Sequence, residues 1–153
     1  MRTVVDLVIA TLQAGMTDGY TEDDQFFVKT WYTADPLAFQ STALPAGAVL
    51  AMTPASRSTV FVGMDTLKDT IAVRLFQGRT RAEADPTEVA AGITRLWGMV
   101  ERAEVLLRTD PTFGAQFVSS EIMSVNPLMP AVNAAVSAAE ITLEIRTRAL
   151  WGS

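Results

Sequence analysis

One long segment with helical periodicity stands between two regions with strand periodicity, and this order constrains the fold more than any other feature. The helical segment opens with Asp85-Pro86-Thr87-Glu88, which places an acceptor at the N-cap, Pro at the first position and Glu at the third. Apolar residues then recur at steps of three and four, namely Val89, Ile93, Leu96, Val100, Ala103 and Leu107. The pattern predicts a helix of about 22 residues that ends near Asp110-Pro111.

Segments typical of strands lie on both sides of this helix. Alternating apolar and polar residues, or short β-branched and aromatic runs, predict strands over 26–32, 48–53, 58–64, 69–77, 115–125 and 139–151. A polar link at Asp65–Lys68 is expected between the third and the fourth of these strands. After Asn126-Pro127 we expect a break, with a short helical turn around 128–135. In the last strand, three apolar residues alternate with polar ones, which predicts one buried and one polar face.

The chain also begins with a helical pattern. Residues 3–15 carry one apolar stripe (Val4, Val5, Val8, Ile9 and Leu12), with Thr3 as the expected N-cap. A polar segment at 17–24 is expected to form a turn. In the long helix, Trp97 lies beside the stripe, and Gly92 and Gly98 are expected to weaken the helix while allowing close backbone packing.

The order of these elements predicts an α+β fold. Strands and helices do not alternate, which disfavours a doubly wound parallel sheet. We therefore expect one domain over residues 1–153, in which an antiparallel (mixed) β-sheet packs against an N-terminal helix and one long central helix. No repeat and no linker divides the sequence.

The composition excludes several classes of function. The chain has neither Cys nor His, so disulfides, thiol chemistry, Ser-His-Asp triads and His-ligated metals are impossible within it. The formal charge of −5 disfavours recognition of a phosphate backbone, although Arg79 with Arg81 or Arg146 with Arg148 could form a local basic patch. The apolar stretch at the N-terminus is too short to span a bilayer, and a signal peptide is disfavoured, so folding in a cytoplasm is expected.

Few residues are candidates for chemistry. Glu22, Asp23 and Asp24 could bind calcium, but consecutive acids lack the alternate spacing of a calcium loop, and a solvated turn is favoured. Tyr32 with Asp35, or Glu121 on its strand, could move protons in a pocket. The cluster Phe26, Phe27, Trp31 and Tyr32 could form a binding surface, and the favoured interpretation is core and strand. We expect no catalytic, cofactor-binding or metal-binding residue, and no enzyme.

Three segments are candidates for contact with other chains. The long loop at 33–47 carries the apolar residues Leu37, Phe39 and Leu44, which must either fold back or meet a partner. The connector at 77–84 carries Arg79 and Arg81. The terminal strand carries Glu144, Arg146 and Arg148 on its polar face, which is either a solvated face or a subunit contact with complementary charges.

The whole pattern resembles the tail terminator proteins of long-tailed bacteriophages. The similarity covers the helix VVDLVIATLQAG, the strands STVFVGM and DTIAVRLFQ, the capped helix DPTEVAAGITRLWGMVERAEVLL and the closing strand AEITLEIRTRAL. It implies a cofactor-free structural protein of the virion tail or neck, assembled in the host cytoplasm as a homo-oligomeric ring, expected to be a hexamer. Such a ring ends the tail tube and joins it to the head-to-tail connector, without binding nucleic acid or membrane.

Other interpretations remain open on the sequence alone. Other neck or connector proteins share much of this organisation, and a non-viral protein-interaction domain would too. A small enzyme or ligand carrier that uses Asp, Glu or Tyr is the least favoured. A ring seen by imaging would favour the first, and a deep pocket around Tyr32, Asp35 or Glu121 would favour the last.

Overall fold

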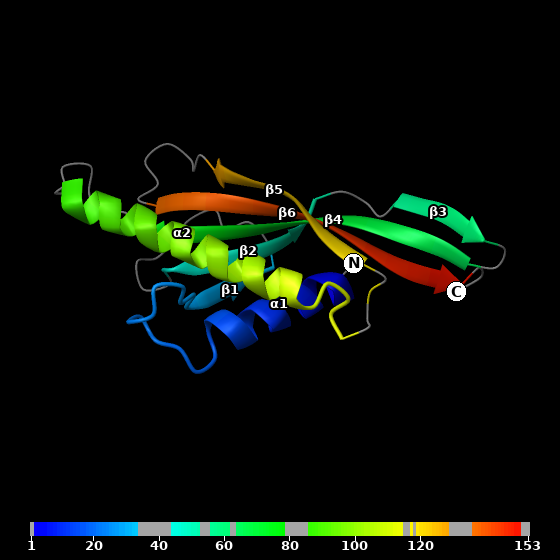
Figure 1. Cartoon of the computed structure of the whole chain (residues 1–153), viewed down its shortest axis with the longest axis horizontal. Coiled ribbons are helices and arrows are strands. Elements are labelled where there is room, and N and C mark those ends of the chain that lie inside the picture. The colour runs from blue at the N-terminus through cyan, green and yellow to red at the C-terminus, as the bar shows by residue number, and fades with distance from the viewer. Residues whose placement is uncertain are drawn as a thin grey trace.

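A computed structural model of the chain describes residues 2–33, 44–52, 56–61, 64–78, 86–114, 117, 119–128 and 136–150. The elements follow in the order α1 (Arg2–Met16), β1 (Thr30–Tyr32), β2 (Ala46–Ala51), β3 (Ser56–Phe61), β4 (Met64–Gly78), α2 (Pro86–Thr109), β5 (Ser119–Leu128) and β6 (Val136–Leu150) (Figure 1). The predicted α+β class, with a mixed sheet and two helices, is confirmed.

The strands form one mixed sheet in the order β1-β2-β4-β6-β5, and β3 adds to β4 beyond the end of β2. Among the described residues, the pairing of β1 with β2 is parallel and the other four pairings are antiparallel. β2 and β3 pair with the same side of β4 at different positions. β2 pairs with residues 71–76 of β4, and β3 pairs with residues 64–68. This sharing lets the sheet continue past the point where β2 ends.

The pairing of β4 with β6 is the longest in the sheet. It runs without a register shift through fifteen residues, from Met64 opposite Leu150 to Gly78 opposite Val136. In Figure 1 the two strands run from beneath α2 toward the opposite end of the molecule, and their ends at the β3 side project beyond both helices. We call this projecting part, residues 56–61, 64–68 and 146–150, the arm.

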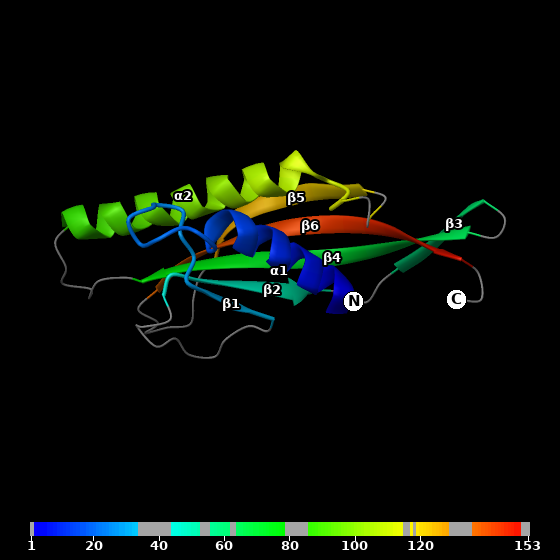
Figure 2. The same cartoon turned by 90° about the horizontal axis from the view of Figure 1, so that it is seen from below.

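The helices cover the other part of the sheet. Figure 2 shows α2 lying along one face of β4 and β6, with α1 packed beside it next to β2. The apolar residues of the strands that point to this side are buried with those of the helices, and they include Val49, Ile71, Val73, Leu75, Ile141, Leu143 and Ile145. Burial of a side chain of this size stabilises the fold by about 1.5–3 kcal/mol, so this face holds the main core.

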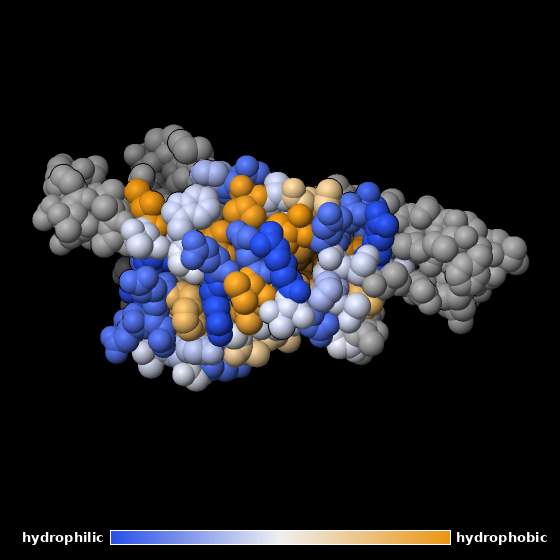
Figure 3. Space-filling model, viewed as in Figure 1, coloured by the Kyte–Doolittle hydropathy of each residue, from blue (hydrophilic) through white to orange (hydrophobic). Residues whose placement is uncertain are grey.

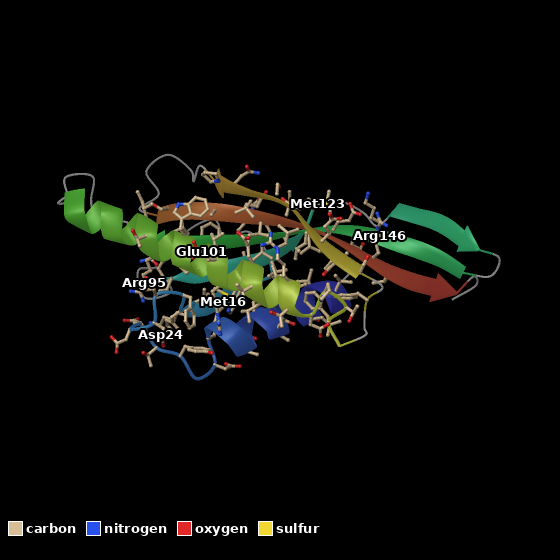
Figure 4. All side chains as sticks on the ribbon, in the orientation of Figure 1. Met16, Asp24, Arg95, Glu101, Met123 and Arg146 are labelled. Atoms are coloured by element: carbon tan, nitrogen blue, oxygen red, sulfur yellow. The ribbon has the colours of Figure 1, made fainter. Side chains whose placement is uncertain are left out.

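Two arginines of α2 hold the segment that follows α1. The Arg102 guanidinium donates to the Gly15 carbonyl oxygen (3.0 Å) and to the Tyr20 hydroxyl (3.1 Å), and it lies 4.6 Å from the centre of the Phe26 ring. Two turns earlier, Arg95 donates to the carbonyl oxygens of Glu22 and Asp24. In Figure 4, Arg95 reaches from α2 to the turn that carries Asp24. The turn is therefore fixed by cations that satisfy its backbone acceptors.

Several predicted boundaries were wrong. The strand expected over 26–32 is only three residues long, because Phe26 packs edge-on against Tyr20 (4.8 Å between ring centres) instead of joining the sheet. The predicted link Asp65–Lys68 lies inside β4, where it pairs with both β3 and β6. Asn126 and Pro127 continue β5, which is an edge strand that tolerates proline, so the expected break is absent there.

The helix patterns were mostly correct. Both helices lie within two residues of the predicted bounds, although α1 begins at Arg2, so Thr3 lies inside it and is no N-cap. On α2, Leu96, Val100, Ala103 and Leu107 are buried as predicted. Ile93 was misassigned and is 43% exposed, while Met99 is fully buried and was missed. Position 99 lies three residues after Leu96 and four before Ala103, so it belongs to the same stripe.

Close packing occurs at glycines other than those predicted. A Cβ on Gly98 would lie 3.8 Å from its nearest neighbour, and one on Gly92 would meet only the Gly78 carbonyl oxygen, also at 3.8 Å. By contrast, the Trp31 ring lies across Gly47, where a Cβ would come within 2.4 Å of it. Trp31 is fixed in place by its indole N–H, which donates to the Thr17 hydroxyl (2.8 Å).

These distances predict opposite effects for two alanine substitutions. Gly47→Ala should lower the free energy of unfolding by about 1–3 kcal/mol, because the packed Trp31 ring must move. Gly98→Ala should raise it by up to about 1 kcal/mol, because alanine favours a helix interior and meets no clash. Urea denaturation of both variants against the wild type checks this, and equal effects of the two substitutions would contradict the packing.

Candidate functional site

The face of the sheet opposite the helices carries a line of charged side chains. Because side chains alternate along a strand, the residues between the core positions of β4 and β6 point to this face. They include Lys68, Arg74, Glu140, Glu144 and Arg146, which we call the charged strip. Arg74 and Glu140 are directly opposite in the register and form an ion pair of 2.7 Å between Nε and Oε2. Opposite charges at such positions stabilise the pairing of the strands.

Glu144 is the centre of the strip near the arm. Lys68 Nζ lies 3.1 Å from its Oε2, and Arg146 donates to its Oε1 from Nη2 (2.9 Å) and Nε (3.1 Å). The Glu144 side chain is 11% exposed, whereas those of Lys68 and Arg146 are 45% and 52% exposed. Burial alone would raise the pKa of Glu144, but the two cations outweigh it and hold that pKa below its usual value. The strip therefore presents two accessible cations around a covered carboxylate.

Glu121 faces Glu144 across β5 and β6. The register places the two acids directly opposite one another, and like charges in that position destabilise strand pairing. Glu144 has its two cations, whereas Glu121 is exposed and forms no ion pair in the described part of the chain. Glu121, which the sequence offers as a candidate acid, borders a hollow in the surface.

This hollow lies between the end of α2 and β5. It has a volume of about 330 Å³ and is lined by Leu107, Arg108, Pro111, Ser120, Glu121, Ile122 and Leu143. Arg108 on its rim is held by Glu104 (3.0 Å). Close by on β5, Met123 sits at a register shift and is 54% exposed. In Figure 4, Met123 marks β5 on the side of the sheet away from α1, and Arg146 marks the root of the arm.

The surface that carries α2 is mixed in character. Figure 3 shows apolar patches along α2 and between α2 and β5, separated by hydrophilic groups. Among the residues of α2 whose side chains the structure describes, the exposed large apolar ones are Ile93, Trp97 and Val105. Apolar residues scattered in this way are common on protein surfaces, so α2 alone does not define a binding site.

The end of the sheet opposite the arm is apolar on its helix-free face. Ala48, Phe76 and Ala138 are buried there, with Tyr32, Leu44 and Leu50 packed against them. Of the apolar loop residues predicted to meet a partner, Leu44 thus folds back onto its own chain, and its place in an interface stays a prediction. Gly78, which lies in the predicted connector, is beside Leu44, since a Cβ there would be 3.6 Å from Leu44 Cδ1.

Other predicted residues have the following places. Leu37, Phe39, Arg79, Arg81 and Asp35 lie outside the described residues, as do most of the helical turn expected at 128–135 and residues 34–43 of the long loop. Arg148 belongs to β6, opposite Thr66 in the arm. Trp31 packs against the main core, as the favoured interpretation of the aromatic cluster predicted. The acids at 22–24 form the predicted turn, in which the Thr21 N–H donates to Asp24 Oδ2 (3.1 Å).

Sequence reasoning missed two features of this face. Lys68 and Arg74 were not recognised as partners of Glu144 and Glu140, because the pairing of distant strands is not visible in the sequence. The signal was present for Arg74, which alternates with Val73 and Leu75 in the same period that revealed the buried face, whereas Asp69 interrupts the pattern next to Lys68. The arm was missed because the expected link at 65–68 divided β4 in two.

A comparison of the chain with protein-family models finds no match, and a search of curated proteins finds none either. Within the part of the chain that the structure describes, no helix is both long and apolar enough to cross a membrane.

The two unusual carboxyl groups of the sheet predict opposite pH effects. The pKa of Glu144 is lowered, so its contribution to stability is present at neutral pH and is lost as the pH falls through its folded pKa. Asp69 is 4% exposed on the helix side, and within the described part of the chain its Oδ1 has no hydrogen-bond donor. Burial raises the pKa of Asp69. Ionised Asp69 therefore costs stability at neutral pH, and this cost is relieved as the pH falls.

We expect Glu144→Gln to lower the free energy of unfolding at pH 7 and Asp69→Asn to raise it. Both differences from the wild type should shrink as the pH falls into the range where carboxyl groups are protonated. Thermal unfolding of the two variants and the wild type from neutral pH down through the acid range measures this. A stabilising Glu144→Gln, or effects independent of pH, would contradict the assigned electrostatics.

Proposed function

We propose that this chain is a structural virion protein whose ring ends the tail tube of a long-tailed phage and joins the tube to the head-to-tail connector. The observation that carries the proposal is the arm, in which three paired strands leave the cover of both helices (Figure 1). The sequence resemblance supplies the particular role, and the arm supplies a physical reason for assembly.

The arm has unpaired strand edges, which are unfavourable in a monomeric protein. Its outer strand β3 pairs with β4 on one side only, and β6 has no strand beside residues 147–150 in the described structure. An unpaired strand edge presents backbone hydrogen-bond donors and acceptors to any other chain. Monomeric proteins therefore usually cover or shorten their edge strands. An extended arm of this kind fits a subunit whose edges are covered by its neighbours.

A ring also requires two different contact surfaces on each subunit. Head-to-tail contacts that close by rotation produce a finite ring with two unlike faces, which is what a terminator needs to bind the tube on one face and the connector on the other. The molecule has such polarity: the arm lies at one end of β4, while Leu44 and Gly78, where the predicted contact segments 33–47 and 77–84 meet the sheet, lie at the other end.

The charged strip fits the proposed protein partners. The charged strip, with two half-exposed cations, suits contacts with a second copy, the tube protein or the connector, in which charge complementarity fixes the register. The predicted interface residues Leu37, Phe39, Arg79, Arg81 and Arg148 remain part of this proposal. We expect a homohexamer that acts without a cofactor, a membrane or direct recognition of nucleic acid.

Inactivation of the gene in its parent genome tests the role. A terminator that is missing should leave tubes of variable and excessive length and heads without tails, and the wild-type gene supplied in trans should restore joined particles. Electron microscopy of lysates measures both. Particles with tails of normal length and joined heads would contradict the role, and a connector protein would leave tube length unchanged.

The purified chain provides a second test. Negative-stain imaging and light scattering should show closed rings, expected to have six subunits. Removing residues 36–43, which keeps the packed Leu44 in place, should abolish the ring or its attachment to tubes without changing the circular dichroism of the monomer. If the shortened chain assembles and binds tubes as the wild type does, the loop has no part in either contact.

A further inference from the structure

Lys68 and Arg146 lie side by side on the face of the sheet that the helices leave free. They are directly opposite in the register of β4 and β6, where two like charges destabilise strand pairing. Glu144 offsets this repulsion, because Lys68 Nζ and Arg146 Nη2 lie 3.1 Å and 2.9 Å from its carboxylate oxygens. We call these three residues the cationic cluster. Two positive charges against one negative leave it a formal charge of +1.

The cationic cluster has hydrogen-bond donors for a further anion. An ammonium and a guanidinium each carry more N–H donors than Glu144 accepts from them here. The side chains of Lys68 and Arg146 are 45% and 52% exposed, whereas that of Glu144 is 11% exposed. On β5, the half-buried Ser119 is directly opposite Arg146 and adds a hydroxyl to the same face. Because Glu144 already holds both cations, an incoming carboxylate meets donors that are oriented in advance.

The turn after α1 carries a group of acids without cations among them. Residues 17–28 contain no Lys or Arg, and their acids are Asp18, Glu22, Asp23 and Asp24, of which the first three are exposed. Arg95 binds the carbonyl oxygens of Glu22 and Asp24, so it fixes the backbone of the turn and does not neutralise its carboxylates. Within the described part of the chain these four acids form no ion pair. The acidic turn, residues 18–24, is therefore held in place with its carboxylates available to a partner.

The acidic turn and the cationic cluster lie apart in one chain. Figure 4 shows Asp24 near one end of the long axis of the molecule and Arg146 toward the other, at the root of the arm. We propose that the acidic turn of one copy docks on the cationic cluster of a second copy, where its carboxylates accept hydrogen bonds from Lys68 and Arg146.

This contact joins two different surfaces, so it is head-to-tail and leaves one free turn and one free cluster at the ends of any open chain. It also places the acids of one subunit against cations of the next, which offsets the repulsion between copies that each carry a formal charge of −5. The inference rests on the proposed ring for its closure, and it names a contact that builds the ring.

Charge reversal on the turn tests the contact. Asp23→Lys should weaken self-association of the full chain about threefold to tenfold, because it replaces an attraction by a repulsion. Glu101→Lys is the matched control, since Glu101 is exposed on α2 and its reversal changes the net charge by the same amount. The control should associate as the wild type does. Sedimentation velocity at several NaCl concentrations measures this, and the difference between the variants should shrink as salt screens the charges.

Variants of the two surfaces should complement one another. Lys68→Glu leaves Arg146 bound to Glu144 and should also weaken association, as should Glu22→Lys combined with Asp23→Lys in one chain. An equimolar mixture of these two variants should associate more strongly than either alone. The reversed charges attract one another across one contact, and the unchanged groups do so across the other, so the two variants alternate around a ring of even number.

A neutral substitution guards against loss of folding. Lys68→Gln avoids a second acid beside Glu144, should keep the thermal midpoint of the wild type within a few degrees, and should give a smaller loss of association than Lys68→Glu. Association of Asp23→Lys at wild-type strength, an equal loss in Glu101→Lys, failure of the mixture to associate, or a wild-type chain that stays monomeric would each overturn the contact.

The outcome separates this contact from the proposed role. Rings that persist despite reversal of either surface overturn the docking of the acidic turn and leave the tail role standing. Conversely, variants that lose and regain assembly as described, in a chain whose inactivation leaves tails normal, support the contact and overturn the tail role.

Discussion

The uninterrupted pairing of β4 with β6 is the constraint on which the rest of the structure depends. One part of this pair lies under α2, where Ile71, Val73, Ile141 and Leu143 build the main core. The other part leaves the helices and becomes the arm. Because the two parts share the same backbone ladder, the core fixes the direction in which the arm projects. An arm that is already paired as strands loses less conformational entropy on association than an unpaired segment would, which favours its use as a contact element.

Side chains along β4 and β6 alternate between the face that packs against the helices and the face that carries the charged strip. Positions that point to α2 are mostly apolar, and positions between them carry the charged strip. Glu144 connects these roles, since it is covered on the sheet but holds the half-exposed cations Lys68 and Arg146. The molecule consequently has a covered face, a charged face and unpaired strand edges in its described part, and this asymmetry fits the proposed head-to-tail ring.

The sequence predicted the parts of this arrangement that depend on local patterns. The capped helix beginning at Asp85-Pro86 and the alternation of Ile141, Leu143 and Ile145 were enough to predict α2, β6 and the α+β class. It did not predict the arm, because a polar run such as Asp65–Lys68 is typical of a turn and becomes a strand only through pairing with β3 and β6. The partners of Glu144 and Glu140 were missed for the same reason, as distant pairing determines them. Of the predicted contact residues, Glu144 and Arg146 do lie together, whereas Leu44 packs onto its own chain.

Hydrogen exchange of the backbone amides, compared between the dilute monomer and the assembled protein, tests most directly whether the copies join through their strand edges. The account predicts that the amides of β3 exchange more slowly on assembly, while those of the core strands Ile71–Leu75 and Ile141–Ile145 are slow in both states. If β3 exchanges at the same rate in both states while assembly protects another surface, the arm is not covered by a neighbouring copy and the account is contradicted.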